Sequence, residues 1–115
     1  MATIAQIVEN AAENLGILGE GETLPSYETA DLTSAYAEVF AELQADELTT
    51  WSSTAAIPDQ YAWAIAMLVA EHRAVKYKVP IPRYQQIKAE AFEAITRIRA
   101  LMMKGQMGQT EIENF

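Results

Sequence analysis

The ten residues from Tyr61 to Ala70 constrain the fold of this chain more than any other stretch, because none of them carries a charged or amide side chain. In a helix, such a run places apolar side chains on two opposed faces, and both faces must then be covered. The run is too short to cross a bilayer, which takes about 20 apolar residues. The sequence therefore predicts a central helix over residues 58–78, covered by its own domain or by a neighbouring subunit. One face carries Tyr61, Ile65, Leu68, His72 and Val75, and the opposite face carries Trp63, Met67, Ala70, Ala74 and Tyr77.

The length and composition fit one folded domain. The chain has 115 residues, half of them hydrophobic, which is enough for a modest core. It has no cysteine, which excludes disulfides, thiolate catalysis and cysteine-based zinc sites and fits a reducing compartment. Residues 1–3 lead into a helix without the basic and apolar regions of an export signal, so none is expected.

Charge is distributed unevenly along the chain. Residues 1–72 hold twelve acidic side chains and no Lys or Arg, whereas residues 73–104 hold all eight basic side chains against two Glu. With a formal net charge of -8, most of the chain repels nucleic acid. Two interpretations stay open: the acidic and basic helices neutralise each other inside one bundle, or oppositely charged surfaces meet between subunits and favour head-to-tail association.

Local signals predict an all-α fold, a small four-helix bundle with an extended C-terminal tail. A capping-box pattern at Thr3 and Gln6 starts a helix over residues 4–15, which Gly16 ends. A second helix begins between residues 26 and 31. Its apolar stripe is Leu32, Ala35, Tyr36, Val39, Phe40 and Leu43.

The second half of the chain supplies the other two helices. A polar loop precedes the central helix, and we expect Trp51 in that loop to fill the edge of the core. The central helix ends before the two prolines of residues 79–82, which cannot continue a helix. A fourth helix follows and ends at Gly105. Its seam is Tyr84, Ile87, Ala91, Ile95, Ile98 and Met102.

Residues 105–115 are predicted to form a flexible C-terminal tail next to a helical domain of residues 1–104. The tail has two glycines and too few apolar side chains to bury a core of its own. Two interpretations remain, a disordered end or an extended segment over residues 111–115 that docks on a partner. The apolar side chains of the tail are Met107, Ile112 and Phe115.

No motif for catalysis, a metal or a cofactor is present, so we expect neither enzymatic activity nor a bound group. His72 is interpreted as a partly buried histidine that hydrogen-bonds to a neighbour, because no nucleophile or orienting partner lies at helical spacing. Two carboxylate pairs, Glu9 with Glu13 and Glu38 with Glu42, share helix faces and leave glycoside hydrolysis open. The basic residues are a weak signal for nucleic-acid binding, because only a few aromatics, such as Tyr77 and Tyr84, lie among them and the overall pI is acidic. These basic residues include Arg73, Lys76, Arg83, Lys88, Arg97 and Arg99.

The order of features along residues 3–104 has a counterpart in a known family. A helix ending in Ala12-Glu13-Asn14-Leu15-Gly16 precedes an acidic loop, an amphipathic helix and the lone Trp51. Then Ile57-Pro58-Asp59-Gln60-Tyr61-Ala62-Trp63-Ala64 opens a long Ala-rich helix, which Val79-Pro80 closes before a last helix. This order resembles that of the head-to-tail adaptor proteins of tailed bacteriophages, most closely those of short-tailed phages, also called head completion or packaged-DNA stabilisation proteins.

The resemblance implies a structural virion protein at the head-tail junction, made in the cytoplasm of the host bacterium. Its copies would form a ring, usually of twelve, which binds the portal protein, extends the DNA channel without specific DNA binding and attaches a nozzle or tail-tube protein. Because members of the family use C-terminal extensions to grip the portal, the portal-binding candidates are Met107, Ile112 and Phe115. The candidates for the subunit interface are Trp63, Met67, Arg73, Lys76, Tyr77 and Arg83.

Two other functions fit the same residues. One is a small intracellular helical protein-interaction domain whose acidic first half binds a basic partner. The other is a cell-wall glycosidase that uses one of the carboxylate pairs. Ring formation on a portal separates the adaptor from the interaction domain, whereas a glycosidase must lose peptidoglycan clearance when a specific Glu is neutralised.

Overall fold

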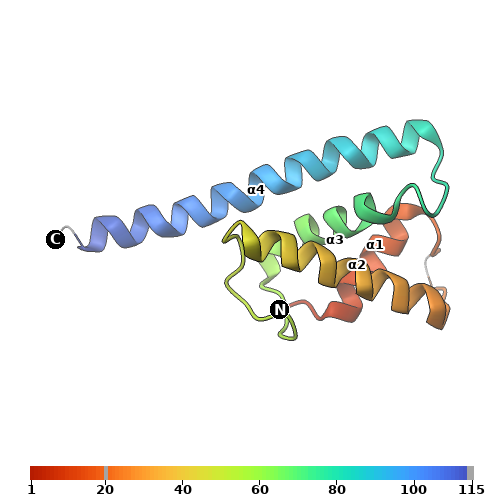
Figure 1. The fold of residues 1–115 in the computed structure, drawn as a ribbon, viewed down its shortest axis with the longest axis horizontal. Coiled ribbons are helices and arrows are strands. Elements are labelled where there is room, and N and C mark those ends of the chain that lie inside the picture. Colours follow the sequence, from red (N-terminus) through yellow and green to blue (C-terminus); the bar gives the residue numbers. More distant parts are fainter. Residues whose placement is uncertain (20, 114–115) are drawn as a thin grey trace.

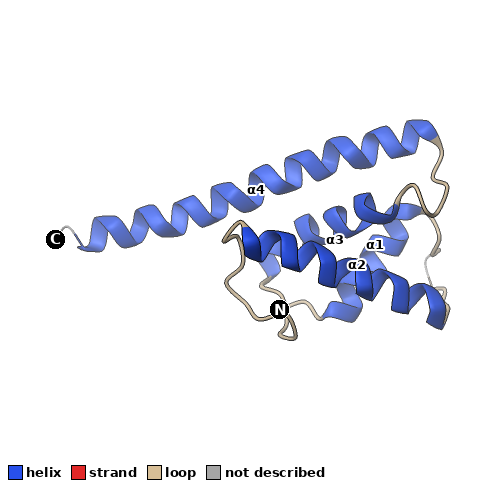
Figure 2. Cartoon of the chain, viewed as in Figure 1, coloured by secondary structure: helices blue, strands red, loops and turns tan. Residues whose placement is uncertain are grey.

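The structure of this chain is a computed structural model that describes the backbone of residues 1–19 and 21–113 and the side chains of residues 1–19 and 21–104. Over this range it contains no strand and the helices α1 (Ile4–Leu15), α2 (Ser26–Ala45), α3 (Asp59–Arg73) and α4 (Ile81–Glu113). Helices α1, α2 and α3 lie together on one side of α4, which extends well past them at its C-terminal end (Figure 1, Figure 2). The predicted all-α four-helix bundle is confirmed.

Helix α3 is the centre of the bundle, because it packs against each of the other three helices. Its buried side chains point in all directions around the helix axis, as the apolar run at its centre predicts. Two residues of the predicted apolar faces lie at the surface instead: Trp63 is 46% exposed, and Val75, beyond the end of α3, is 76% exposed. The buried residues of α3 are Tyr61, Ala64, Ile65, Ala66, Met67, Val69 and Ala70.

The first helix begins and ends as predicted. Thr3 Oγ1 accepts a hydrogen bond from Gln6 N at 3.2 Å, and Gln6 Oε1 accepts one from Thr3 N at 2.9 Å, which completes the capping box. Gly16 ends the helix with a φ of 79°, which glycine adopts without steric cost. Two backbone hydrogen bonds of 2.8 and 2.7 Å between Ala2 and Ile57 then tie the chain before α1 to the segment before α3.

Helices α2 and α3 end in the same kind of turn, although the left-handed residue is not glycine. Glu47 follows α2 with a φ of 59°, and Lys78 follows α3 with a φ of 55°. The amide that follows each left-handed residue donates a hydrogen bond to the carbonyl oxygen five positions earlier, which is the Schellman arrangement. Leu48 N donates to Leu43 O at 2.8 Å, and Val79 N donates to Ala74 O at 3.3 Å. Helix α3 itself ends at Arg73, earlier than predicted, and residues 74–78 form a separate turn that carries this motif.

The C-terminal helix is longer than predicted. Helix α4 continues through Gly105 to Glu113, so the predicted stop at Gly105 is wrong, and residues 111–113 are helical rather than extended. A glycine inside a helix costs only about 1 kcal/mol relative to alanine, and it ends the helix only where the chain turns to a left-handed φ. The predicted boundary between residues 104 and 105 thus falls inside α4. The side chains of the portal-binding candidates Met107, Ile112 and Phe115 lie outside the described residues.

Trp51 anchors the loop between α2 and α3 to the core, as predicted. Its ring centroid lies 5.1 Å from that of Tyr61 and 6.2 Å from that of Phe40. Its indole Nε1 donates a hydrogen bond of 3.2 Å to Tyr36 Oη. Aromatic pairs at such distances contribute about 0.5–1.5 kcal/mol beyond the burial of area. The aromatic contacts therefore fix this polar loop against the bundle.

Candidate functional site

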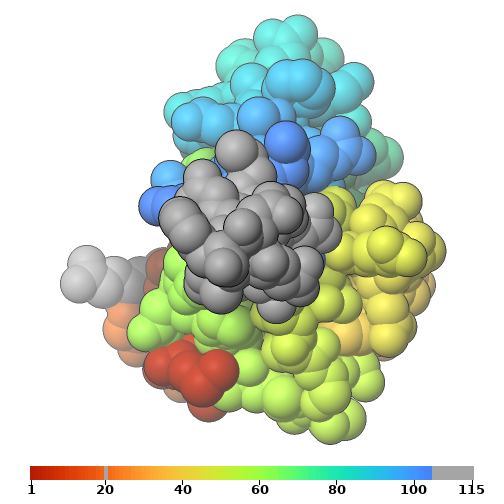
Figure 3. All heavy atoms as spheres, turned by 90° about the vertical axis from the view of Figure 1, so that its left-hand side faces the viewer, coloured from red at the N-terminus to blue at the C-terminus, as the bar shows by residue number. Residues whose placement is uncertain are grey.

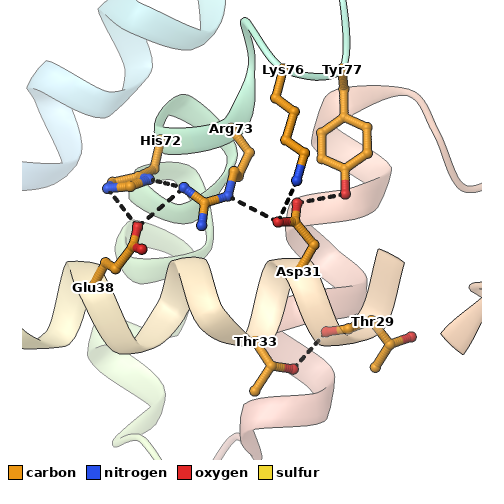
Figure 4. A network of polar contacts seen from close by, with 8 residues as sticks. All are labelled: Thr29, Asp31, Thr33, Glu38, His72, Arg73, Lys76 and Tyr77. Carbon is orange, nitrogen blue, oxygen red and sulfur yellow. Dashed lines mark hydrogen bonds and ion pairs between the residues drawn. The ribbon is translucent and has the colours of Figure 1, made fainter. Parts of the chain in front are cut away.

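An interhelical ion cluster joins α2 to the C-terminal end of α3 (Figure 4). Helix α2 contributes two carboxylates seven positions apart, which places them on one face of the helix. The last turn of α3 and the turn after it contribute the other side chains. The members of the ion cluster are Asp31, Glu38, His72, Arg73, Lys76 and Tyr77.

Asp31 receives the larger number of contacts in the ion cluster. Lys76 Nζ lies 2.7 Å from Asp31 Oδ1, Tyr77 Oη donates a hydrogen bond of 2.8 Å to Oδ2, and Arg73 Nε lies 3.4 Å from Oδ1. Burial pushes the pKa of Asp31 up, but hydrogen bonds from Lys76 and Tyr77 and the charge of Arg73 outweigh burial, so the pKa is lowered. The same arrangement raises the pKa of Tyr77, first through burial and then through its hydrogen bond to the carboxylate.

Glu38 binds the other end of the Arg73 side chain. Arg73 Nη1 donates a hydrogen bond of 3.1 Å to Glu38 Oε2 and lies 2.8 Å from Nδ1 of His72. An arginine has only donors, so His72 Nδ1 accepts and the ring proton resides on Nε2, which lies 3.3 Å from Glu38 Oε2. Burial lowers the pKa of Arg73, but Glu38 and Asp31 raise it by more. The prediction that His72 is partly buried and hydrogen-bonded to a neighbour is confirmed.

The ion cluster uses several of the predicted interface residues inside one chain. Arg73, Lys76 and Tyr77 bind carboxylates of α2 in the same molecule. For these residues the structure follows the interpretation in which the acidic and basic parts of the chain neutralise each other within the bundle. Their contacts hold the end of α3 against α2.

The other interface candidates occupy three different environments. Trp63 lies at the surface beside an open hollow of about 350 Å³ between α3 and α4. Met67 is 1% exposed and belongs to the core of the chain. Arg83, at the start of α4, donates two hydrogen bonds of 3.2 and 2.9 Å to the carbonyl oxygen of Asn14. That carbonyl is among the last of α1, where a helix lacks internal donors and favours a cation.

A second hollow, of about 90 Å³, lies between α2 and α4 above α3, and we call it the α2–α4 groove. Its apolar part consists of Val39, Leu43, Leu68 and Ile95, and its polar part consists of Glu42, Asp46, Glu71 and His72.

Phe92 of α4 is 75% exposed, and sequence reasoning left it unassigned. Its position outside the predicted seam of α4 is the signal that could have identified it, since an aromatic residue there faces solvent.

The described part of the chain gives little support for a metal site, for glycoside hydrolysis or for a membrane span. No group of three or more His, Asp or Glu side chains there is placed to hold a metal ion. Glu38 is 52% exposed and Glu42 is 72% exposed, whereas the acid of a glycosidase pair is usually buried. Of the helices within these residues, none combines the length and apolarity that a membrane span requires.

The comparisons with known proteins add no family. No family model matches the chain, and neither a curated protein nor a solved structure matches it.

Proposed function

We propose that this chain is a head-to-tail adaptor of a tailed bacteriophage, a structural subunit that forms a ring under the portal and attaches the tail. In this role the protein carries no catalytic site. The chain extends the DNA channel of the portal, and its net acidic charge keeps the passing DNA from binding. The proposal is based on the order of helices, prolines and the lone Trp51 along residues 3–104, together with the shape of the folded chain.

The observation that carries the proposal is the projection of α4 beyond the other three helices (Figure 1). Figure 3 shows residues 81–104 of α4 on one side of the other helices, and the longest dimension of the molecule is 52 Å against 29 and 25 Å for the others. Where the helix leaves the bundle, Met103 is 59% exposed. An α-helix can bind through one face in a groove of another protein. The projecting part of α4 is therefore the segment that we assign to the portal.

The decisive experiment measures mass by light scattering, first for the purified chain and then after addition of portal particles from the same source. An adaptor adds a ring-sized increment of mass to the portal. Absence of an increment at any mixing ratio contradicts the proposal. Portal particles mixed with the chain truncated after residue 105 serve as the matched control, because that chain keeps the bundle and lacks the projecting part of α4.

A small interaction domain for a basic partner is the second candidate. Its support is the exposed acidic side of α2, where Glu42 and Asp46 lie free of Lys or Arg partners among the described side chains. On this alternative, the chain binds a basic protein and ignores the portal. The same light-scattering experiment with a basic test protein such as a histone separates the two candidates.

A further inference from the structure

Helical spacing places three side chains of α4 on the side of the helix that borders the α2–α4 groove. Lys88 lies seven positions before Ile95, Phe92 lies three positions before it, and Arg99 lies four positions after it. These are the spacings of neighbours on one helix face. Ile95 itself lines the groove. The α4 edge of the groove therefore presents two cations on either side of an exposed phenyl ring. Lys88 and Arg99 form no ion pair among the described side chains.

The opposite edge of the groove is acidic. Glu42 and Asp46 stand there at the C-terminal end of α2, and both are exposed. The last turn of α2 has no basic residue, so the negative end of its helix dipole adds to the two carboxylates. Among the described side chains, the one basic residue within 4.0 Å of these two carboxylates is His72, whose Nε2 is 3.9 Å from Glu42 Oε1. This edge thus lacks the cation that the C-terminal end of a helix favours.

The two edges make the groove complementary to itself. A rotation by half a turn about an axis along the groove places the α2 edge of one copy over the α4 edge of the other, and the reverse contact forms at the same time. Both contacts then bring the carboxylates of one copy opposite the cations of the other, and the phenyl ring of Phe92 lies against the α2 edge of the other copy's groove. A contact of this isologous kind closes at two copies.

We propose that the α2–α4 groove binds the same groove of a second copy, so that the free chain forms a two-fold dimer. The proposal goes beyond the adaptor function and concerns the chain before it meets any partner. The dimer covers Phe92 and neutralises the acidic end of α2. Because it closes at two copies, it keeps free chains from growing into larger assemblies without a template.

Sedimentation equilibrium of the full chain, without portal, tests the proposal. At low ionic strength the mass is expected to rise with concentration from one chain to two and to stop there. At high salt the transition should move to higher concentration, because exposed charges are screened over about 10 Å at 0.1 M salt and over less at higher salt. A mass of one chain at every concentration, or a mass that grows past two, overturns the proposal.

Charge reversal makes the test specific to this groove. The variants Glu42→Lys/Asp46→Lys and Lys88→Glu/Arg99→Glu should each stay monomeric, whereas an equimolar mixture of the two should form the dimer again. Both variants remain net acidic, since the natural chain has a formal charge of -8 and each substitution changes it by two. Overall attraction therefore cannot explain recovery in the mixture, and failure to recover contradicts the charge pairing.

Two further variants control for folding and for position. Phe92→Ser removes the exposed ring without disturbing the core and should abolish the dimer while the helical circular dichroism stays unchanged. Glu93→Lys/Arg97→Glu reverses an opposite pair of charges beside Trp63 on the other flank of α4 and should leave the dimer intact. Because none of these measurements includes the portal, failure of the dimer leaves the adaptor proposal to its own experiment.

Discussion

The phenol of Tyr77 donates a hydrogen bond of 2.8 Å to Asp31 Oδ2 across 46 positions of the chain. Burial raises the pKa of Tyr77, and this bond raises it further, whereas burial of Asp31 is outweighed by the hydrogen bonds from Lys76 and Tyr77, so the pKa of Asp31 is lowered. The ion cluster therefore affects stability at both ends of the pH scale, and each end can be tested with one substitution.

Asp31→Asn is expected to destabilise the fold by about 1–2 kcal/mol at neutral pH, because a hydrogen-bonded carboxylate is lost from a partly buried site. The folded pKa of Asp31 lies below the ordinary value of 3.8. The stability from this residue is therefore fully present above that value and is lost as the pH falls through the lowered one. Urea unfolding over an acidic pH series should show a weaker pH dependence for the variant. Glu9→Gln, an exposed position on α1, should match the natural chain.

Tyr77→Phe tests the alkaline end. The folded pKa of Tyr77 lies above the ordinary value of 10.0, so its contribution is fully present below that pH and is lost as the pH rises through the folded value. Thermal unfolding between neutral pH and pH values above 10 should therefore show a smaller alkaline loss of stability in the variant. Tyr84→Phe is the control, because the hydroxyl of Tyr84, unlike those of Tyr36, Tyr61 and Tyr77, forms no hydrogen bond with a described side chain. An equal alkaline loss in the Tyr77 variant and the natural chain contradicts the assignment.

Lys78→Gly is expected to stabilise the protein by about 0.5–1 kcal/mol, because glycine removes the steric cost of a left-handed residue at the end of a helix. Lys78 has a φ of 55° and an exposed side chain. Lys78→Ala retains that cost, so it should bring no gain. Chemical denaturation of the three chains side by side measures the difference, and a loss of stability in the glycine variant is the contrary result.

Trp51→Ala is expected to cost about 3 kcal/mol, the lower end of the range for removal of a large buried aromatic, because Trp51 is partly exposed. The loss includes its contacts with Tyr61 and Phe40 and leaves Tyr36 without its donor. Trp63→Ala is the matched control, since Trp63 is 46% exposed and should cost far less. Urea unfolding followed by circular dichroism compares the two. Similar costs at both positions would contradict the assigned role of Trp51.

Removal of residues 106–115 tests the role of the projecting part of α4. The deletion removes none of the buried residues of the described core. The melting temperature should therefore stay unchanged, and the helical circular dichroism should fall only by the share of the removed residues. Attachment to the portal should be lost. If the shortened chain unfolds instead, these residues belong to the core and the assignment to the portal is wrong.

The local signals of the sequence predicted the helices well. The capping box at Thr3 and Gln6, the stop at Gly16 and the position of Trp51 all depend on short-range chemistry, and the structure confirms them. The predicted helix end at Gly105 is wrong, because α4 continues through this residue. Glycine has a low helix propensity both at a helix end and inside a helix, and only its backbone conformation distinguishes the two positions. The turn at Lys78 was missed for a related reason, since a lysine gives no signal for a left-handed conformation.

By itself, the sequence determined the helical class and the central place of α3, because a helix that is apolar on two faces has to be covered on both. The sequence also shows that acidic residues dominate the first part of the chain and basic residues the second. Only the tertiary structure decided which charges meet: Arg73 and Lys76 bind α2 within the chain, while Lys88 and Arg99 form no ion pair among the side chains that the structure describes. The reason is physical, since an ion pair depends on a distance of a few ångströms between residues far apart in sequence, and the packing of the helices sets that distance.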